Sequence, residues 1–198
     1  MKWLIDFFVG LFVNDFVVHT WKRFKHKFIE RRLNHSKGRF WKKRIPNMKE
    51  TAKIHGDVVV SSPKNLVIED HVRIGRNCHF ACEGGLTIKE NAQLSRNILI
   101  YTVNHDIDAD CIPYDTTNVK KPVVIGKSVW IGMNVTITPG VTIGDGAIIG
   151  MSTVVSKDVP PGAIVVGGPS RIVGERDMEK FAELQEQQKL FGVLFPDA

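Results

Sequence analysis

The sequence lacks the cysteine pattern of a disulfide-stapled or zinc-stabilised protein. Its 198 residues include three cysteines, Cys78, Cys82 and Cys111, an odd number that cannot pair completely. Cys78 and Cys82 have neither a second cysteine pair nor histidines at zinc-finger spacing beside them. We therefore expect three reduced thiols, as is typical of cytoplasmic proteins, and no metal site.

The sequence also lacks an apolar run that could cross a membrane. The apolar segment over residues 3–18 is 16 residues long and carries Asp6, Asn14 and Asp15. A spanning helix needs about 20 apolar residues with few charges, and a secretory signal needs an uncharged apolar centre before a small-residue cleavage site. We expect this segment neither to span a membrane nor to be cleaved.

Acidic residues are scarce in the amino-terminal quarter of the chain. Residues 1–48 hold 12 Lys and Arg against three Asp and Glu, a net charge of +9, whereas residues 49–198 hold 15 against 18, a net charge of −3. As a helix, residues 3–18 would present a broad aromatic surface formed by Trp3, Phe7, Phe8, Phe12 and Phe16. This face and the basic block after it predict contact with an anionic membrane through residues 1–44; packing on the protein's own oligomer stays open as the alternative. No nucleic-acid-binding motif accompanies the charge, so we expect no nucleic acid partner.

A period of six residues organises the rest of the chain. Aliphatic residues recur at every sixth position at Ile125, Ile131, Ile137, Ile143, Ile149 and Val155. The same period appears upstream at Ile68, Ile74 and Phe80 and again at Ile88, Leu94 and Ile100, with about two extra residues near positions 83–85. This period fits neither an isolated amphipathic helix nor a hairpin array, and it is typical of a hexapeptide β-helix, in which three hexads form one coil. The sequence therefore predicts an all-β solenoid whose aliphatic side chains stack along its axis.

The period is interrupted between Ile100 and Ile125. The interruption, residues 101–122, is rich in polar and ionisable groups. A solenoid tolerates insertions at its corners, where they leave the stack as loops, often on the binding face. We therefore expect the chemistry of the protein to lie on this loop.

Several motifs then follow one another in order along the solenoid. They are Asn104-His105-Asp106, Pro122–Gly126, Val129–Met133, Pro139–Gly144, Ile149–Pro161 and Gly167–Arg171. In this order they resemble the left-handed parallel β-helix acyltransferases, specifically the maltose/galactoside O-acetyltransferase-like branch. The resemblance covers roughly residues 54–175. The short helical amino-terminal substrate region of that family is not recognisable here, so the resemblance does not identify the acceptor.

These patterns divide the chain into three parts. They are a helical arm over residues 1–48, a left-handed β-helix domain over 49–175 with the extruded loop 101–122, and a C-terminal helix and tail over 176–198. In the last part we expect Asp177 to cap the helix and Gly192 to end it.

The resemblance implies acetyl transfer from acetyl-CoA to a saccharide hydroxyl, for example of a surface polysaccharide, a lipopolysaccharide or a precursor. Such a hydroxyl is a poor nucleophile at neutral pH and needs a base, and His is the side chain whose ordinary pKa is nearest neutrality. By resemblance His105 is that base, and Asn104 and Asp106 bind the acceptor or orient the imidazole. A turn-forming role for Asn104 and Asp106 stays open.

The resemblance also implies contacts to CoA along the solenoid wall. A backbone N–H at Gly132–Met133 would stabilise the oxyanion, and Lys157 and Arg171 would contact phosphates. The residues expected to bind the cofactor are Trp130, Gly132, Met133, Met151, Ser152, Ser156, Lys157 and Arg171. Solvated charge for Lys157 and Arg171, and packing at a subunit face for Trp130, stay open.

The family further implies a homotrimer in the cytoplasm, peripheral on the inner face of the membrane if the arm binds lipid. The alternatives are a serine or other small-molecule acetyltransferase and a non-enzymatic membrane-associated scaffold. A γ-type carbonic anhydrase would need a second histidine five residues from His105, and those positions are Ile100 and Asp110. We therefore expect a metal-independent acyltransferase.

Overall fold

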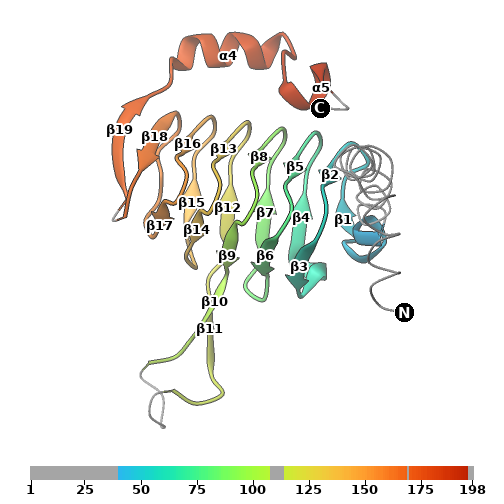
Figure 1. Cartoon of the computed structure of the whole chain (residues 1–198), viewed down its shortest axis with the longest axis vertical. Helices are drawn as coiled ribbons and strands as arrows, with labels where there is room; N and C mark the ends of the chain where they lie inside the picture. The colour runs from blue at the N-terminus through green and yellow to red at the C-terminus, as the bar shows by residue number, and fades with distance from the viewer. Residues whose placement is uncertain (1–39, 108–113, 169, 196–198) are drawn as a thin grey trace, which may run out of the picture.

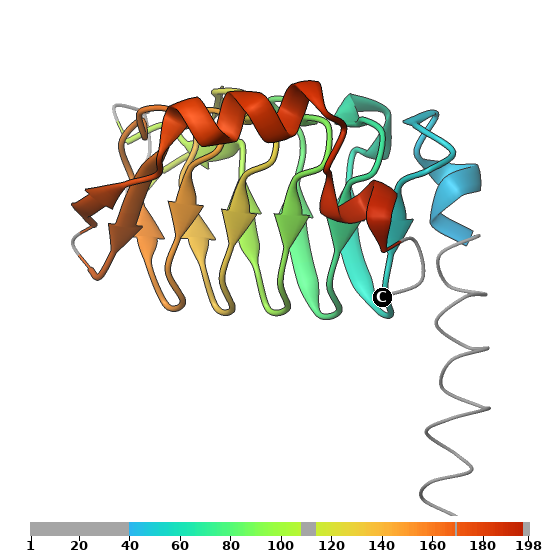
Figure 2. The same ribbon diagram turned by 90° about the horizontal axis from the view of Figure 1, so that it is seen from above.

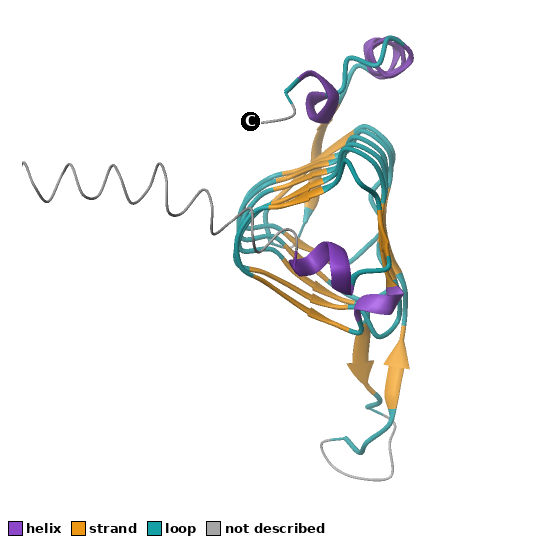
Figure 3. Cartoon of the chain, turned by 90° about the vertical axis from the view of Figure 1, so that its right-hand side faces the viewer, coloured by secondary structure: helices purple, strands orange, loops and turns teal. Residues whose placement is uncertain are grey.

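The computed structural model describes residues 40–107, 114–168 and 170–195, so the predicted arm falls outside the described residues up to position 39. The described chain winds into a left-handed parallel β-helix with a triangular cross-section (Figures 1 and 3). This confirms the predicted fold class. Residues 40–44 are helical and lead into the first coil.

Three sheets form the walls of the solenoid. Sheet A consists of β1 (Asn47–Met48), β4 (Leu66–Ile68), β7 (Leu86–Ile88), β12 (Val123–Ile125) and β15 (Thr142–Ile143). Sheet B consists of β2 (Lys53–Ile54), β5 (Arg73–Ile74), β8 (Gln93–Leu94), β13 (Trp130–Ile131), β16 (Ile148–Ile149), β18 (Ala163–Val166) and β19 (Arg171–Glu175). Sheet C consists of β3 (Val58–Ser61), β6 (Cys78–Ala81), β9 (Leu99–Tyr101), β14 (Thr136–Ile137) and β17 (Val154–Val155).

The hexad aliphatics stack directly above one another along the axis. In sheet A the register aligns Ile68, Ile88, Ile125 and Ile143, and each is fully buried. Neighbouring strands in a sheet lie about 4.8 Å apart, so identical side chains pack in continuous contact along the axis. Burying each such side chain contributes about 1.5–3 kcal/mol of transfer free energy. The period of six is therefore the core pattern of the fold.

The coil length also follows the sequence prediction. Thr136 aligns with Val154 of the next coil, and upstream Val58 aligns with Cys78 of the next coil. The upstream coil, from Val58 to Cys78, is therefore two residues longer than the coil from Thr136 to Val154. The extra residues lie at the corner after sheet C, where the first coil forms the 3₁₀ turn η2 (Pro63–Asn65) and the next coil turns at Glu83–Gly85. Both insertions leave the sheet register intact.

The other corners turn on residues in the left-handed backbone conformation. Equivalent positions with positive φ are His71, Asn91 and Ser128 between sheets A and B, and Asn77, Asn97, Asn134 and Ser152 between sheets B and C. Asn tolerates this conformation better than most residues because its short side chain bonds locally. Stacked Asn side chains also bond to each other, since Asn97 Nδ2 donates to Asn134 Oδ1 at 2.9 Å.

After the last coil the chain reverses and covers sheet B. β19 pairs antiparallel with β18, and then α4 (Met178–Glu186) and α5 (Phe191–Leu194) run back over sheet B toward the first coils (Figure 2). Asp177 caps α4 as predicted, because its side chain accepts from the Lys180 N–H at 3.0 Å.

The prediction that Gly192 ends the helix is wrong. α4 ends at Glu186, and Gly192 is buried inside α5, where its N–H donates to Asn91 Oδ1 at 3.0 Å. An added Cβ at Gly192 would lie 2.5 Å from the His71 carbonyl oxygen, so the glycine is needed for close approach to the solenoid. No helix in the part of the chain that the structure describes is long and apolar enough to span a bilayer.

Candidate functional site

The interruption of the repeat leaves the solenoid as a β-hairpin at the corner between sheets C and A. Its strands are β10 (Val103–His105) and β11 (Asn118–Lys120), which pair antiparallel and project away from the prism (Figure 1). Residues 108–113, which include Cys111, lie outside the described residues. The two described strands of the insertion thus form a hairpin outside the stack of coils.

Thr102 anchors the base of this hairpin to the preceding coil. Its fully buried hydroxyl donates to the Ala81 carbonyl at 2.7 Å and accepts from the Gly84 N–H at 2.8 Å. The Thr102 carbonyl accepts from the Lys121 N–H at 2.9 Å, which joins the two limbs. A Cβ on Gly84 would lie 2.1 Å from the Thr102 oxygen, so only glycine permits this contact.

The three predicted catalytic residues lie together at the end of β10. His105 and Asn104 are exposed, and Asp106 is half-buried with its N–H donating to the Thr117 carbonyl at 3.2 Å. Asn104 Oδ1 accepts from the His105 N–H at 3.0 Å, so this side chain shapes the local backbone. Sequence reasoning missed Tyr114, whose ring stacks on the His105 imidazole with centroids 3.8 Å apart and planes 6° apart.

Four of the predicted cofactor residues lie at the corner between sheets B and C. Gly132 and Met133 stack on Met151 and Ser152 of the next coil, and the Ser152 N–H donates to the Met133 carbonyl at 2.8 Å. A Cβ at Gly132 would lie 2.7 Å from the Met151 nitrogen, which explains the glycine.

An arginine at this corner was not predicted as a site residue. Arg96 Nε donates to Met133 Sδ at 3.0 Å, which brings a cation beside the predicted oxyanion donor. Arg76 occupies the equivalent position one coil earlier, and both side chains are exposed. The signal that identifies them is repeat phase, since each directly precedes the corner asparagine, Asn97 or Asn77.

The remaining predicted cofactor residues lie elsewhere on the solenoid. Ser156 and Lys157 follow β17 and are exposed at the corner between sheets C and A, the corner from which the hairpin leaves. Arg171 opens β19 and is exposed opposite Val166. Met133 thus lies at the corner where the strands of sheet C begin. The hairpin and Lys157 lie at the corner where those strands end.

The outward face of sheet C lies between these two corners. Its outward residues align across the strands in the order Val59, His79, Leu99, Thr136 and Val154. None of these five side chains is Lys, Arg, Asp or Glu, and Val59 and Val154 are 56% and 44% exposed. This row therefore offers three aliphatic side chains, Val59, Leu99 and Val154, and no Lys, Arg, Asp or Glu.

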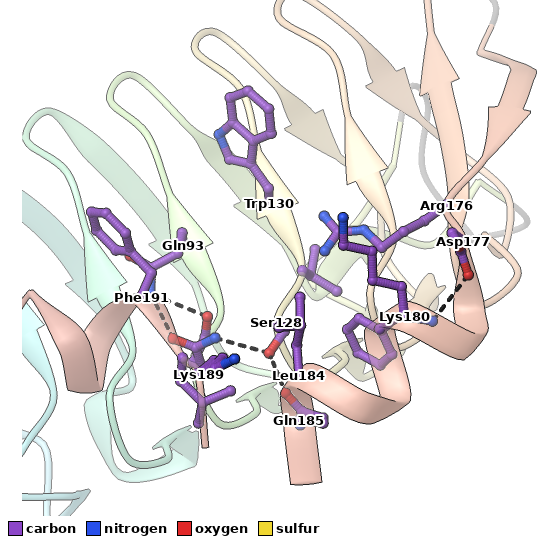
Figure 4. A pocket seen from close by; sticks show the side chains of 14 residues that line it. Gln93, Ser128, Trp130, Arg176, Asp177, Lys180, Leu184, Gln185, Lys189 and Phe191 are labelled. Carbon is purple, nitrogen blue, oxygen red and sulfur yellow. Dashed lines mark hydrogen bonds between the residues drawn. The ribbon is translucent and has the colours of Figure 1, made fainter. Parts of the chain in front are cut away.

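Trp130 lies on a different wall from the hairpin. It projects from the outer face of sheet B and is 54% exposed at the edge of a cavity of about 370 Å³ beneath α4 and α5 (Figure 4). This cavity lies on the opposite side of the prism from the hairpin (Figure 3). A single chain therefore does not bring Trp130 and His105 together.

The cavity beneath α4 combines apolar walls with basic groups. Phe181 and Leu184 line it, and Arg176, Lys180 and Lys189 supply positive charge. Burial lowers the pKa of the Arg176 guanidinium, which lies over the Phe181 ring at 5.7 Å. The cavity is suited to a group that carries both apolar surface and negative charge.

The described cysteines do not act as nucleophiles. Cys78 and Cys82 are buried, and burial raises the pKa of both thiols, that of Cys82 to about 12. Both therefore remain protonated near neutral pH, and the reactive thiolate is not formed. Within the described ranges, no group of three or more His, Cys, Asp or Glu side chains is arranged to hold a metal ion.

Known proteins are similar to this chain over most of its length. A family model described as bacterial transferase hexapeptide (six repeats) matches residues 122–157. Nodulation protein L of Rhizobium meliloti (strain 1021) is 40% identical over 110 residues, which cover 56% of this chain and only 60% of that relative. Galactoside O-acetyltransferase of Escherichia coli (strain K12) is 30% identical over 161 residues, covering 78% of this chain and 79% of that relative.

A solved structure shares the fold. The hexapeptide-repeat-containing acetyltransferase of Vibrio cholerae O1 biovar eltor, crystallised in complex with acetyl-CoA, aligns with a TM-score of 0.57 and 26% sequence identity. The alignment covers 76% of this chain and 91% of that structure.

Proposed function

The chain belongs to the hexapeptide-repeat acetyltransferases, and from this premise we propose that it transfers the acetyl group of acetyl-CoA to a saccharide hydroxyl. The observation that carries the proposal is the exposed His105 on a hairpin at the interruption of the repeat. A relative named for galactosides supports a saccharide acceptor, and a similar structure complexed with acetyl-CoA supports the donor.

His105 acts as the general base in the proposed reaction. The imidazole takes the acceptor proton while the acceptor oxygen attacks the carbonyl carbon of the thioester. The tetrahedral intermediate collapses, the carbon–sulfur bond breaks, and the imidazolium returns the proton to the departing CoA thiolate. The exposure of His105 supports this role, because both substrates must reach the ring.

A backbone N–H at the corner between sheets B and C stabilises the oxyanion in this proposal. The Gly132 N–H donates to the Ile149 carbonyl at 2.8 Å, so the Met133 N–H is the candidate donor of the pair. Donors held in place before the reaction stabilise developing charge without reorganising. Arg96, bonded to Met133 Sδ, adds positive charge nearby.

The proposed site is completed by a second copy of the chain. Within one chain, His105 and Met133 lie at the corners at opposite ends of the strands of sheet C. The hairpin also projects outward from its own solenoid (Figure 1). A partner whose corner between sheets B and C meets this hairpin would bring the base to the oxyanion donor. This arrangement supports the homotrimer implied by the family.

The CoA contacts follow from the same arrangement. Met151 and Ser152 precede β17, Ser156 and Lys157 follow it, and all four are exposed, so they could contact an extended pantetheine arm laid along this strand. Lys157 and Arg171 are exposed and contact the phosphates through charge-assisted hydrogen bonds. Trp130, with the cations of its cavity, offers a further CoA contact from the other face.

An acceptor panel tests the proposed function. The purified chain is incubated with acetyl-CoA and, separately, with galactosides, maltose, nucleotide sugars, polysaccharide fragments and serine; CoA release and product mass are measured. We expect CoA release above the rate with water for at least one saccharide. Acetylation of serine alone would identify a small-molecule acetyltransferase, and inactivity with every acceptor would favour a scaffold.

We propose that the protein is cytoplasmic and that its amino-terminal arm binds the inner face of the membrane. This proposal rests on the aromatic and basic sequence of the arm, which falls mainly outside the described residues. Each basic residue near an anionic membrane contributes about 1 kcal/mol. Replacing Lys22 and Lys25 by Gln in the full-length protein is therefore expected to weaken partition onto phosphatidylserine vesicles roughly 30-fold at low salt.

Vesicle sedimentation measures this partition. Lys64→Gln with Lys120→Gln is the matched control, because it removes the same charge from exposed positions of the solenoid and hairpin. Equal binding of the two double variants, or no binding by the unmodified protein, would contradict the membrane proposal. The arm would then pack on the oligomer.

A further inference from the structure

The ring of Tyr114 covers one face of the His105 imidazole. The two centroids are 3.8 Å apart and the planes differ by 6°, so the rings are stacked nearly parallel and in contact. Both side chains are exposed, and Tyr114 retains 47% of its accessible surface. The imidazole is therefore held on one face while its edge remains open to solvent.

The stack joins the two limbs of the hairpin near its outer end. His105 pairs with Asn118 across the ladder, and Tyr114 lies on the returning limb just before that pair. The base of the hairpin is set by Thr102, but Val103 and Asn104 separate Thr102 from His105, and Asn104 is exposed. The ring contact, by comparison, acts directly on the His105 side chain.

A second His–Tyr pair shows that this close contact is particular to the hairpin. His79 and Tyr101, on the outer face of sheet C, are also parallel at 5°, but their centroids are 5.9 Å apart. These are the two tyrosines of the chain. Only the hairpin pair is at full ring contact.

We propose that Tyr114 is a positioning residue for His105, which rests on the proposed role of His105 as the base. The stack limits rotation of the imidazole, so that its nitrogen edge meets the acceptor hydroxyl rather than one of its faces. The electron-rich face of the phenol ring also attracts the imidazolium that forms when the base takes its proton. Tyr114 thereby favours both the reactive orientation and the protonated intermediate state.

Tyr114→Ala in the full-length protein tests this role. We expect kcat for CoA release to fall roughly 10- to 100-fold, as for a misplaced catalytic group, while KM for acetyl-CoA changes less than about twofold. The rate is measured with a galactoside acceptor and also with water as the acceptor. Tyr114→Phe retains the ring and is expected to keep near-normal kcat. Ile107→Ala, which truncates an 83% exposed side chain of the same hairpin, is the matched control.

Two measurements separate positioning from a structural effect. The double variant His105→Ala/Tyr114→Ala is expected to be no slower than His105→Ala alone, because residues that act as a unit are not additive. The ring-current shift of the His105 C–H protons in the NMR spectrum should disappear in Tyr114→Ala and persist in Tyr114→Phe.

The outcomes distinguish this inference from the proposed function. If His105→Ala keeps its turnover, the base assignment is wrong, and the positioning role of Tyr114 is then wrong as well. If His105→Ala is inactive but Tyr114→Ala turns over normally, or if the double variant is slower than His105→Ala, the positioning role alone is overturned.

Discussion

Replacing His105 by Ala is expected to lower kcat for acetyl transfer by about 10²–10⁴-fold, the usual contribution of a general base. The physical reason is that a sugar hydroxyl at neutral pH attacks a thioester slowly unless its proton is taken in the transition state. The binding of acetyl-CoA should persist, because the predicted CoA contacts lie on the solenoid rather than on the hairpin. Steady-state CoA release and isothermal titration with acetyl-CoA measure the two effects separately.

His55→Ala is the matched control for this experiment. His55 is also an exposed histidine, but it follows β2 in the first coil and not the hairpin. It is expected to leave turnover unchanged. Near-normal turnover of His105→Ala would contradict the mechanism, and loss of folding in that variant is checked by its circular dichroism spectrum.

Replacing Gly84 by Ala is expected to destabilise the fold and to displace the hairpin. The new Cβ would lie 2.1 Å from the Thr102 carbonyl oxygen and 2.9 Å from the Lys121 nitrogen, both of which are backbone atoms. Overpacking of this kind costs about 2 kcal/mol, which lowers Tm by roughly 4–8 °C for a chain of this length. Turnover should also fall, because Thr102 leads directly into the strand that carries His105.

Gly174→Ala provides the comparison for Gly84. An added Cβ at Gly174 would meet only Ile164 Cδ1, at an ordinary distance of 3.7 Å. Its Tm should stay within about 1–2 °C of the unmodified protein, since substitutions at such positions cost little. Equal melting temperatures of the two variants, measured by calorimetry, would show that the hairpin base tolerates the added methyl group.

Much of the fold could be predicted because a β-helix records its structure locally. Each hexad places one aliphatic residue at the axis, so the period from Ile125 to Val155 specifies the core without any long-range information. The two extra residues near Glu83 and the interruption after Ile100 were also visible as phase shifts of the same period. In each case the phase of the repeat identified the corner at which the chain leaves the stack.

The course of the C-terminal helices was less predictable. Asp177 was recognisable as a cap because capping is a local hydrogen bond. The role of Gly192 was not, because its glycine serves a close contact with His71, which is distant in the sequence. A glycine that ends a helix and a glycine that allows close packing look alike in a sequence.

The candidate site shows the same division. The motif around His105 drew attention to the hairpin, and the catalytic and cofactor roles of the motif residues stay predictions. Tyr114 carries no motif, and Arg96 is identified only by its repeat phase. Their contacts with His105 and Met133 depend on how the hairpin limbs and the stacked coils meet.

The sequence by itself determined the solenoid, its corners and the place where the repeat opens, because each hexad packs against its immediate neighbours along the axis. Only the tertiary structure decided what lies against each wall, such as α4 over sheet B and the Tyr114 ring against His105. Trp130 and His105 lie on opposite sides of the prism because the phase of each residue around the triangular coil sets its wall. Proximity in the sequence therefore does not give proximity in space, and for this reason we propose that a second copy of the chain completes the site.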